Sequence, residues 1–127
     1  MPPNGFSVTH YVGIAGVGSD AASWPMDGDA IGFFGYDRTL HEKDFKGGLA
    51  NTLMVIQTGL DNGPWVASGY PTVQGYEPER VPYFGIGGQF GGLHRGGANA
   101  LFADGSVRFL SDDIDRGVLE AMCKIAK

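Results

Sequence analysis

A histidine and an aspartate that enclose a glycine-rich stretch are the residues whose types best suit catalysis. Nine residues separate His94 from Asp104. Histidine titrates near neutral pH, so His94 suits a general base that activates water, and exposed backbone N–H groups of the loop would stabilise an oxyanion. Residues 98–103 span roughly 17 Å when extended, so the two side chains meet only if residues 93–97 fold back. The alternative is that His94 holds the loop through backbone carbonyls while Asp104 serves a turn.

Three carboxylates within four residues form a second candidate site, for a metal ion. Asp112, Asp113 and Asp115 precede an apolar stretch near the end of the sequence. Ca²⁺ takes about six to eight oxygen ligands, which these carboxylates and nearby backbone carbonyls could supply. Aspartate is also favoured at helix N-caps and in first turns, so capping explains the same residues without a metal.

Aromatic residues in the middle of the chain could bind a sugar or another ligand by stacking. They are Trp65, Tyr70, Tyr76, Tyr83 and Phe84. Most of them lie in residues 60–81, where three prolines and scattered glycines predict irregular chain. The alternative is that these rings are buried beneath a long loop as part of the core.

Several classes of protein are disfavoured by composition. The net charge of −5, the pI near 4.9 and the lack of any Lys/Arg cluster give no basic surface for nucleic acid. No apolar run approaches the roughly 18 residues of a membrane span, so none is expected in this chain. Cys123 is the only cysteine and cannot form an internal disulfide. Common catalytic and metal-binding motifs, such as G-x-S-x-G and H-E-x-x-H, are missing from the sequence.

The element that would position His94 and Asp104 is a β-hairpin. Asp104-Gly105 stands between two apolar runs, which predicts a two-residue type I′ turn. In that register Phe102 faces Val107 and Ala100 faces Phe109. Side chains alternate across a strand, so these four residues share one face, and we expect that face to be core.

Other patterns complete the predicted fold. Residues 7–18 alternate as a strand, and residues 31–36 suggest a bent or edge strand. Residues 51–58 indicate a buried strand, with a short helix as the alternative. An apolar stripe after residue 111 predicts a short C-terminal helix. With 22 glycines and 127 residues, we expect one domain, residues 1–127. Its class is α+β, β-dominated, with a small antiparallel sheet, long Gly/Pro-rich loops and that helix.

The spacing of His94, nine residues and then Asp104-Gly105 resembles the His-X9-Asp-Gly domain of planctomycete-type prepilin-like proteins. Here the motif covers residues 94–105. Shorter similarities occur in four other places: Tyr11-Val12-Gly13-Ile14-Ala15-Gly16, Phe34-Gly35-Tyr36-Asp37-Arg38, Asn51-Thr52-Leu53-Met54-Val55 and Asp61-Asn62-Gly63-Pro64-Trp65.

The resemblance implies a head related to the major pseudopilins of type II secretion, here without their N-terminal helix. It also implies a location outside the cytoplasm, in the periplasm or cell envelope. Such heads hold Ca²⁺ in a C-terminal loop, and their partners are other pseudopilin-like or secretion-apparatus proteins.

Three functions are compatible with these patterns. The first is a calcium-stabilised structural or assembly domain that acts by protein–protein contact. The second is a calcium-dependent hydrolase of an ester, lactone or glycosidic substrate, with His94 and Asp104 in its site. The third is a carbohydrate- or peptide-binding module that uses the aromatic residues.

Overall fold

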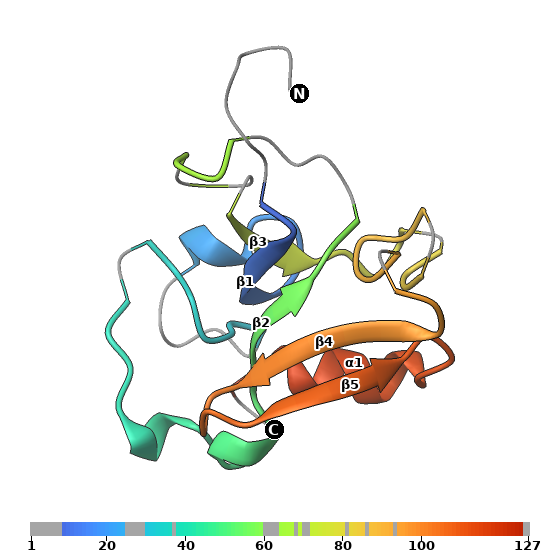
Figure 1. Ribbon diagram of the computed structural model, residues 1–127. Coiled ribbons are helices and arrows are strands. Elements are labelled where there is room, and N and C mark those ends of the chain that lie inside the picture. The colour runs from blue at the N-terminus through green and yellow to red at the C-terminus, as the bar shows by residue number, and fades with distance from the viewer. Residues whose placement is uncertain are drawn as a thin grey trace.

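The computed structural model describes most of the chain between residues 9 and 125. The described residues are 9–24, 30–36, 38–59, 64–67, 69, 72–80, 82–85, 87–92 and 94–125. In chain order (Figure 1) the elements are β1 (Tyr11–Val17), η1 (Ala21–Ser23), η2 (Glu42–Asp44), η3 (Leu49–Asn51), β2 (Leu53–Gln57), β3 (Val73–Tyr76), β4 (Gly97–Phe102), β5 (Val107–Ser111) and α1 (Arg116–Met122). The η elements are single 3₁₀ turns. The β-dominated α+β class predicted from the sequence is confirmed.

The strands form one sheet in the order β3-β1-β2-β4-β5. Antiparallel pairing joins β1 with β2, β2 with β4 and β4 with β5, whereas β1 and β3 run parallel. The small sheet is therefore mixed, with three of its four pairings antiparallel. The strands predicted within residues 7–18 and 51–58 are confirmed as β1 and β2, with narrower bounds.

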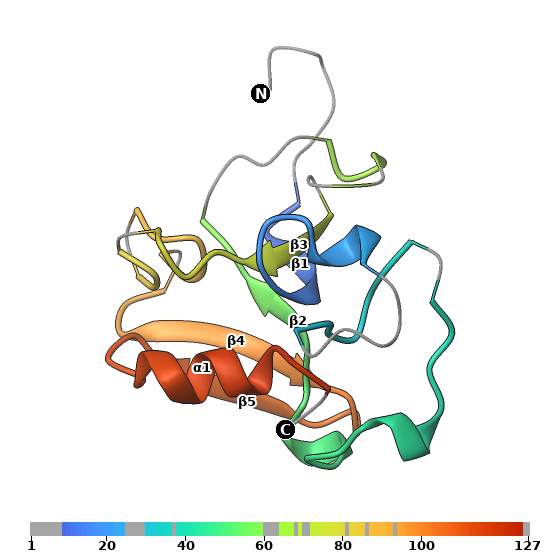
Figure 2. The same cartoon turned by 180° about the vertical axis from the view of Figure 1, so that it is seen from behind.

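Helix α1 covers one face of the sheet, behind β4 and β5 in Figure 1 and in front of them in Figure 2. It begins after Asp115, whose Oδ1 accepts hydrogen bonds from the N–H groups of Gly117 (2.8 Å) and Val118 (3.2 Å). This is the N-cap arrangement that aspartate favours. The predicted C-terminal helix is confirmed, and it places Leu119 and the Cys123 that follows it fully inside the protein.

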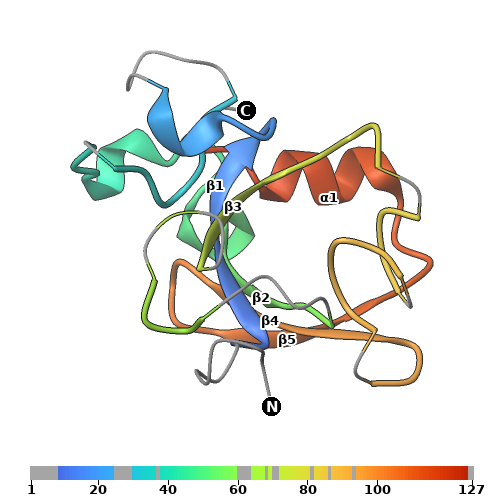
Figure 3. The ribbon, with the colours of Figure 1, turned by 90° about the horizontal axis from the view of Figure 1, so that it is seen from above.

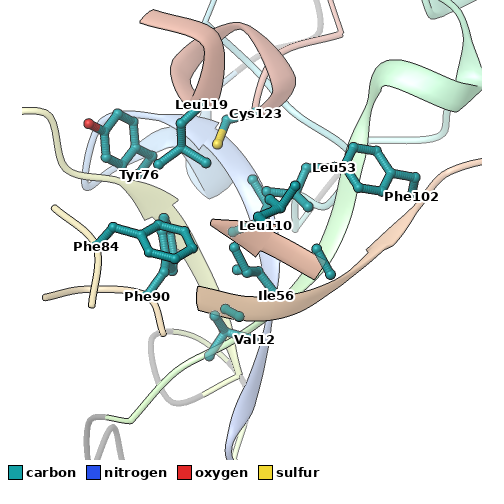
Figure 4. Close-up of a cluster of buried hydrophobic side chains, with 13 residues drawn as sticks. Val12, Leu53, Ile56, Tyr76, Phe84, Phe90, Phe102, Leu110, Leu119 and Cys123 are labelled. Carbon is teal, nitrogen blue, oxygen red and sulfur yellow. The ribbon is translucent and has the colours of Figure 1, made fainter. Parts of the chain in front are cut away.

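The core lies between α1 and the sheet and draws on all five strands, as the close-up in Figure 4 shows. Its buried residues are Val12, Ile14, Leu53, Ile56, Tyr76, Phe84, Phe90, Ala98, Ala100, Phe102, Leu110, Leu119 and Cys123. Phe84 and Phe90 come from the segment before β4, so the glycine-rich loop is anchored in the core through its aromatic side chains.

Strand β3 lies inside a region that the sequence predicted to be irregular, residues 60–81. This part of the prediction was wrong. The strand has four residues and stands at an edge of the sheet, where neighbouring prolines are tolerated because one side makes no ladder. Gly75 allows a close approach to the residue that follows β1, since a Cβ there would lie 1.8 Å from the carbonyl oxygen of Gly18.

Arg38 holds together the chain that follows β1. Its Nη1 donates to the carbonyls of Gly32 (2.9 Å) and Ala15 (3.3 Å), and its Nη2 donates to that of Ala21. Burial lowers the pKa of the guanidinium, because the charged form is partly desolvated. In residues 31–36, predicted as a bent or edge strand, Ile31 alone forms a bridge, with Gly16.

The β4–β5 hairpin has a different turn from the one predicted. The N–H of Gly105 donates to the carbonyl of Phe102 and the N–H of Phe102 donates to the carbonyl of Ser106, both at 2.9 Å. Gly105 has a positive φ of 88°, and no non-glycine residue in the described chain has a positive φ. A type I′ turn requires positive φ at both central residues, so Asp104 excludes it. The loop is residues 103–105, a type I turn followed by a left-handed glycine.

Because the loop has three residues instead of two, the pairing of β4 with β5 is shifted by one residue from the predicted register. Leu101 now pairs with Val107 and Ala100 with Arg108. A slip of one residue moves every side chain of a strand to the opposite face. Ala100 and Phe102 are buried as expected, but Val107 is 68% exposed and Phe109 54% exposed, so the prediction that they join the core was wrong.

Candidate functional site

His94 and Asp104 stand at opposite ends of strand β4. His94 forms a bridge with Gly97 where the strand begins, and Asp104 occupies the turn beyond its end. Six residues of strand separate the two ends, roughly 20 Å of extended chain. Both side chains are exposed, and the structure does not bring them into one site.

Asp104 is engaged in turn chemistry. Its Oδ1 accepts hydrogen bonds from the hydroxyl of Ser106 (2.6 Å) and from the N–H of the same residue (2.9 Å). These bonds stabilise the ionised form and lower the pKa of the Asp104 carboxyl. The side chain therefore carries a negative charge at one end of the hairpin.

The three carboxylates proposed as calcium ligands have separate environments. The carboxylate of Asp113 accepts from the hydroxyl of Ser111 (2.5 Å), Asp115 caps α1, and Asp112 lies beside the loop at Gly85, where an added Cβ would stand 3.7 Å from the Asp112 Cβ. Within the described chain, no three His, Cys, Asp or Glu residues are grouped as a metal site would require. Asp112, Asp113 and Asp115 are thus not gathered around one point here, and the calcium site stays a prediction from the sequence.

The glycine-rich loop is held by a buried amide. Nε2 of Gln89, a side chain with no exposure, donates to Gln74 Oε1 (3.2 Å) and to the carbonyl of Gly75 (2.8 Å). Its Oε1 accepts from the N–H of Glu77 (2.9 Å). Several loop amides also bond within the protein, such as Gly85 to the carbonyl of Phe90. The loop is therefore attached to β3, and those of its amides that bond within the protein are not free to stabilise an oxyanion.

The candidate stacking residues do not form one surface among those that the structure describes. Tyr76 and Phe84 are buried, Tyr83 is half-buried and donates its hydroxyl hydrogen bond to the carbonyl of Ile114, and Trp65 is 59% exposed. Tyr70 lies outside the described residues. Burial accounts for most of these rings, as the core alternative predicted.

The most distinctive surface is the side of the sheet opposite α1. We call its open part the outer face, defined by Tyr11, Val55, Leu101, Val107 and Phe109. Figure 3 shows α1 on one side of β4 and β5 and no described helix on the other. A shallow depression of about 390 Å³ lies on this face, lined mainly by its apolar residues and by Asn99 and Ala100.

Two local features set the limits of the outer face. At the β1 end, Phe34 lies over Gly13, where a Cβ would meet the ring at 2.6 Å. At the β5 end, a Cβ on Gly97 would meet the Phe109 ring at 2.8 Å, so Phe109 lies across a glycine of β4. Between them the face is open, and Tyr11 is 43% exposed.

Sequence reasoning missed this face because it assigned the wrong turn. The run Ala103-Asp104-Gly105 fits either a two-residue turn with Asp104 and Gly105 or a three-residue loop that ends in a left-handed glycine. Gly97 is the signal that could have separated the two. A glycine inside a strand leaves room for a neighbouring aromatic ring to cover it, which places Phe109 on the same face as Gly97.

Comparison with known proteins gives one match. Residues 63–117 match the model of a family described as "Protein of unknown function (DUF1559)". The matched segment includes β3, β4 and β5, with the whole of the His94–Gly105 motif. No curated protein and no solved structure matches the chain. In the part of the chain that the structure describes, no helix has the length and apolar character of a membrane span.

Proposed function

We propose that this chain is a pseudopilin-like structural or assembly domain that works outside the cytoplasm by protein–protein contact through the outer face. The observation that carries the proposal is the exposure of two apolar side chains, Val107 and Phe109, on the face of β5 that α1 does not cover. Contiguous exposed apolar surface on a globular protein commonly marks an interaction site. The resemblance of residues 94–105 to prepilin-like proteins supports an assembly role.

The size of the patch bears on the kind of contact. A fully covered aromatic side chain buries about 150–250 Å², so half-exposed Tyr11 and Phe109 offer roughly 100 Å² each. With Val107, the face exposes on the order of 300 Å² of apolar side chain, compared with about 800 Å² per partner in a typical stable interface. The partner must therefore contact more than these side chains, for example the neighbouring strand edge.

Site-specific photo-crosslinking tests the proposal. A photoreactive phenylalanine analogue is placed at Phe109 or, as a matched control, at Trp65, an aromatic residue of similar exposure outside the sheet. The protein is expressed in its native host from its full natural coding sequence, and the cells are irradiated. We expect a discrete adduct with a cell-envelope protein from position 109 and none from position 65. The same adducts from both positions, or adducts with cytoplasmic proteins alone, would contradict the proposal.

A further inference from the structure

Strand β5 presents a free backbone edge beside the outer face. It is the last strand of the sheet, and no described strand pairs with its outer side. In an antiparallel ladder alternate residues direct their N–H and C=O groups toward the partner strand. The bond from Phe102 to the carbonyl of Ser106 and the bond from Asp112 to the carbonyl of Gly96 fix that alternation. In β5 the backbone N–H and C=O groups of even-numbered residues therefore point toward β4. Those of Val107, Phe109 and Ser111 point away from β4, toward the free edge.

Among the described residues, this edge lacks several of the features that usually block strand pairing. Natural edge strands are protected by lysine, proline, bulges or a covering segment. The sequence of β5, VRFLS, has no lysine or proline. Its one charged side chain is Arg108, which is exposed and lies on the face opposite Val107 and Phe109: its guanidinium lies 3.7 Å from the ring centre of Phe102 and donates to the carbonyl of Ala50 at 2.8 Å. On the outer face, Val107, Phe109 and Ser111 carry no charge.

Negative charge flanks the edge at both ends. Asp104 is exposed in the turn before β5, and Asp112 and Asp113 are exposed directly after it. If a second copy paired antiparallel about Phe109, residues 104–106 of one chain would approach residues 112–114 of the other. Acidic groups would then face each other at both ends, which disfavours self-pairing and favours a partner with basic ends.

We propose that β5 accepts an extended segment of another protein as an added antiparallel strand, with apolar residues at alternate positions and Lys or Arg at both ends. Main-chain hydrogen bonds would form with Val107, with Phe109 and with the N–H of Ser111, whose carbonyl already accepts from the N–H of Ile114 at 3.1 Å. The apolar side chains would extend the outer face. The basic ends would lie near Asp104 at one end and near Asp112 and Asp113 at the other. This inference rests on the proposed function, since it specifies how the partner binds the same surface.

A synthetic peptide tests this mode of binding. The probe is fluorescein-labelled Lys-Thr-Val-Thr-Phe-Thr-Val-Thr-Lys, and its binding to the whole chain is followed by fluorescence anisotropy. In the proposed pairing the Val and Phe amides face β5 and the Thr amides face solvent. We expect N-methylation of the three apolar residues to weaken binding at least about tenfold, and N-methylation of three Thr residues to change it little. Equal effects of the two modifications would overturn the proposal.

Charge provides the second arm of the experiment. Replacing both Lys residues of the probe with Glu should weaken binding at least about tenfold, and added salt should reduce the difference. On the protein, Asp112→Asn should weaken binding of the Lys probe about threefold, whereas Asp20→Asn, which removes an exposed acid far from β5, should not. Unchanged affinity in the Glu probe would overturn the assignment of basic ends.

Two outcomes separate this inference from the proposed function. If no probe binds while position 109 still gives a discrete crosslink, strand addition is wrong and the proposed contact surface stands. If the protein alone dimerises through β5 in sedimentation experiments and binds no probe, the occupant is a second copy and the inference is overturned.

Discussion

The register of the β4–β5 hairpin predicts that Val107 tolerates substitution and that Leu110, on the opposite face of β5, does not. Val107 is 68% exposed, and Leu110 is 7% exposed. Val107→Thr keeps the shape and β-branching of the side chain at an exposed site, so it should change the free energy of unfolding by no more than about 0.5 kcal/mol. Leu110→Ala removes most of a buried side chain beneath α1 and should cost about 2–3 kcal/mol, within the range for core leucines.

Urea unfolding followed by circular dichroism measures the difference. Proteins of this size lose about 1–3 kcal/mol of stability per molar urea, so Leu110→Ala should lower the midpoint by roughly 0.7–3 M. Val107→Thr should leave it almost unchanged. In the register of a two-residue turn the roles are reversed, because Val107 would be core and Leu110 exposed. A larger loss in Val107→Thr than in Leu110→Ala would refute the reasoning about the slip.

Three further predictions concern other parts of the molecule. Tyr76 is fully buried and its hydroxyl has no hydrogen-bond partner within the described chain, so Tyr76→Phe should raise the free energy of unfolding by about 1 kcal/mol in denaturant titrations. Burial raises the pKa of this hydroxyl, so the unfolded chain ionises first, and stability should fall above about pH 10 less steeply in Tyr76→Phe than in the parent. Lysine lacks the forked guanidinium, so Arg38→Lys cannot donate to several carbonyls at once and should lower the free energy of unfolding by at least about 2 kcal/mol. A smaller loss than in a surface control such as Lys43→Arg would contradict this role. Calcium stabilisation stays a prediction from the sequence, and if an ion is bound, EGTA should lower the Tm. An unchanged Tm together with no calcium found by elemental analysis would contradict this prediction.

Much of the fold could be predicted because local patterns and tertiary structure agree. The buried run of β2 is nearly continuous and apolar, and Asp115 stands directly before the apolar stripe of α1 and caps it. Strand β3 was missed because Val73–Tyr76 is short, contains a glycine, and gains its place from pairing with β1 and from the Gln89 amide. Such long-range contacts leave no local periodicity.

The candidate site shows where sequence reasoning ends. The hairpin was predicted correctly, but its turn type was not, and one residue of register decides whether Val107 and Phe109 are core or surface. Apolar residues in a strand indicate burial on average, so an exposed interaction face is easily mistaken for core. The spacing of His94 and Asp104 likewise could not reveal that an extended strand would separate them.

Nuclear Overhauser effects across the β4–β5 hairpin, measured by NMR, test the central claim most directly. In an antiparallel ladder the Hα atoms of a non-hydrogen-bonded pair lie close together, so the slipped register predicts Hα–Hα contacts between Leu101 and Val107 and between Asn99 and Phe109. Contacts of Phe102 with Val107 and of Ala100 with Phe109, which are the pairs of a two-residue turn, would contradict the slipped register and with it the outer face.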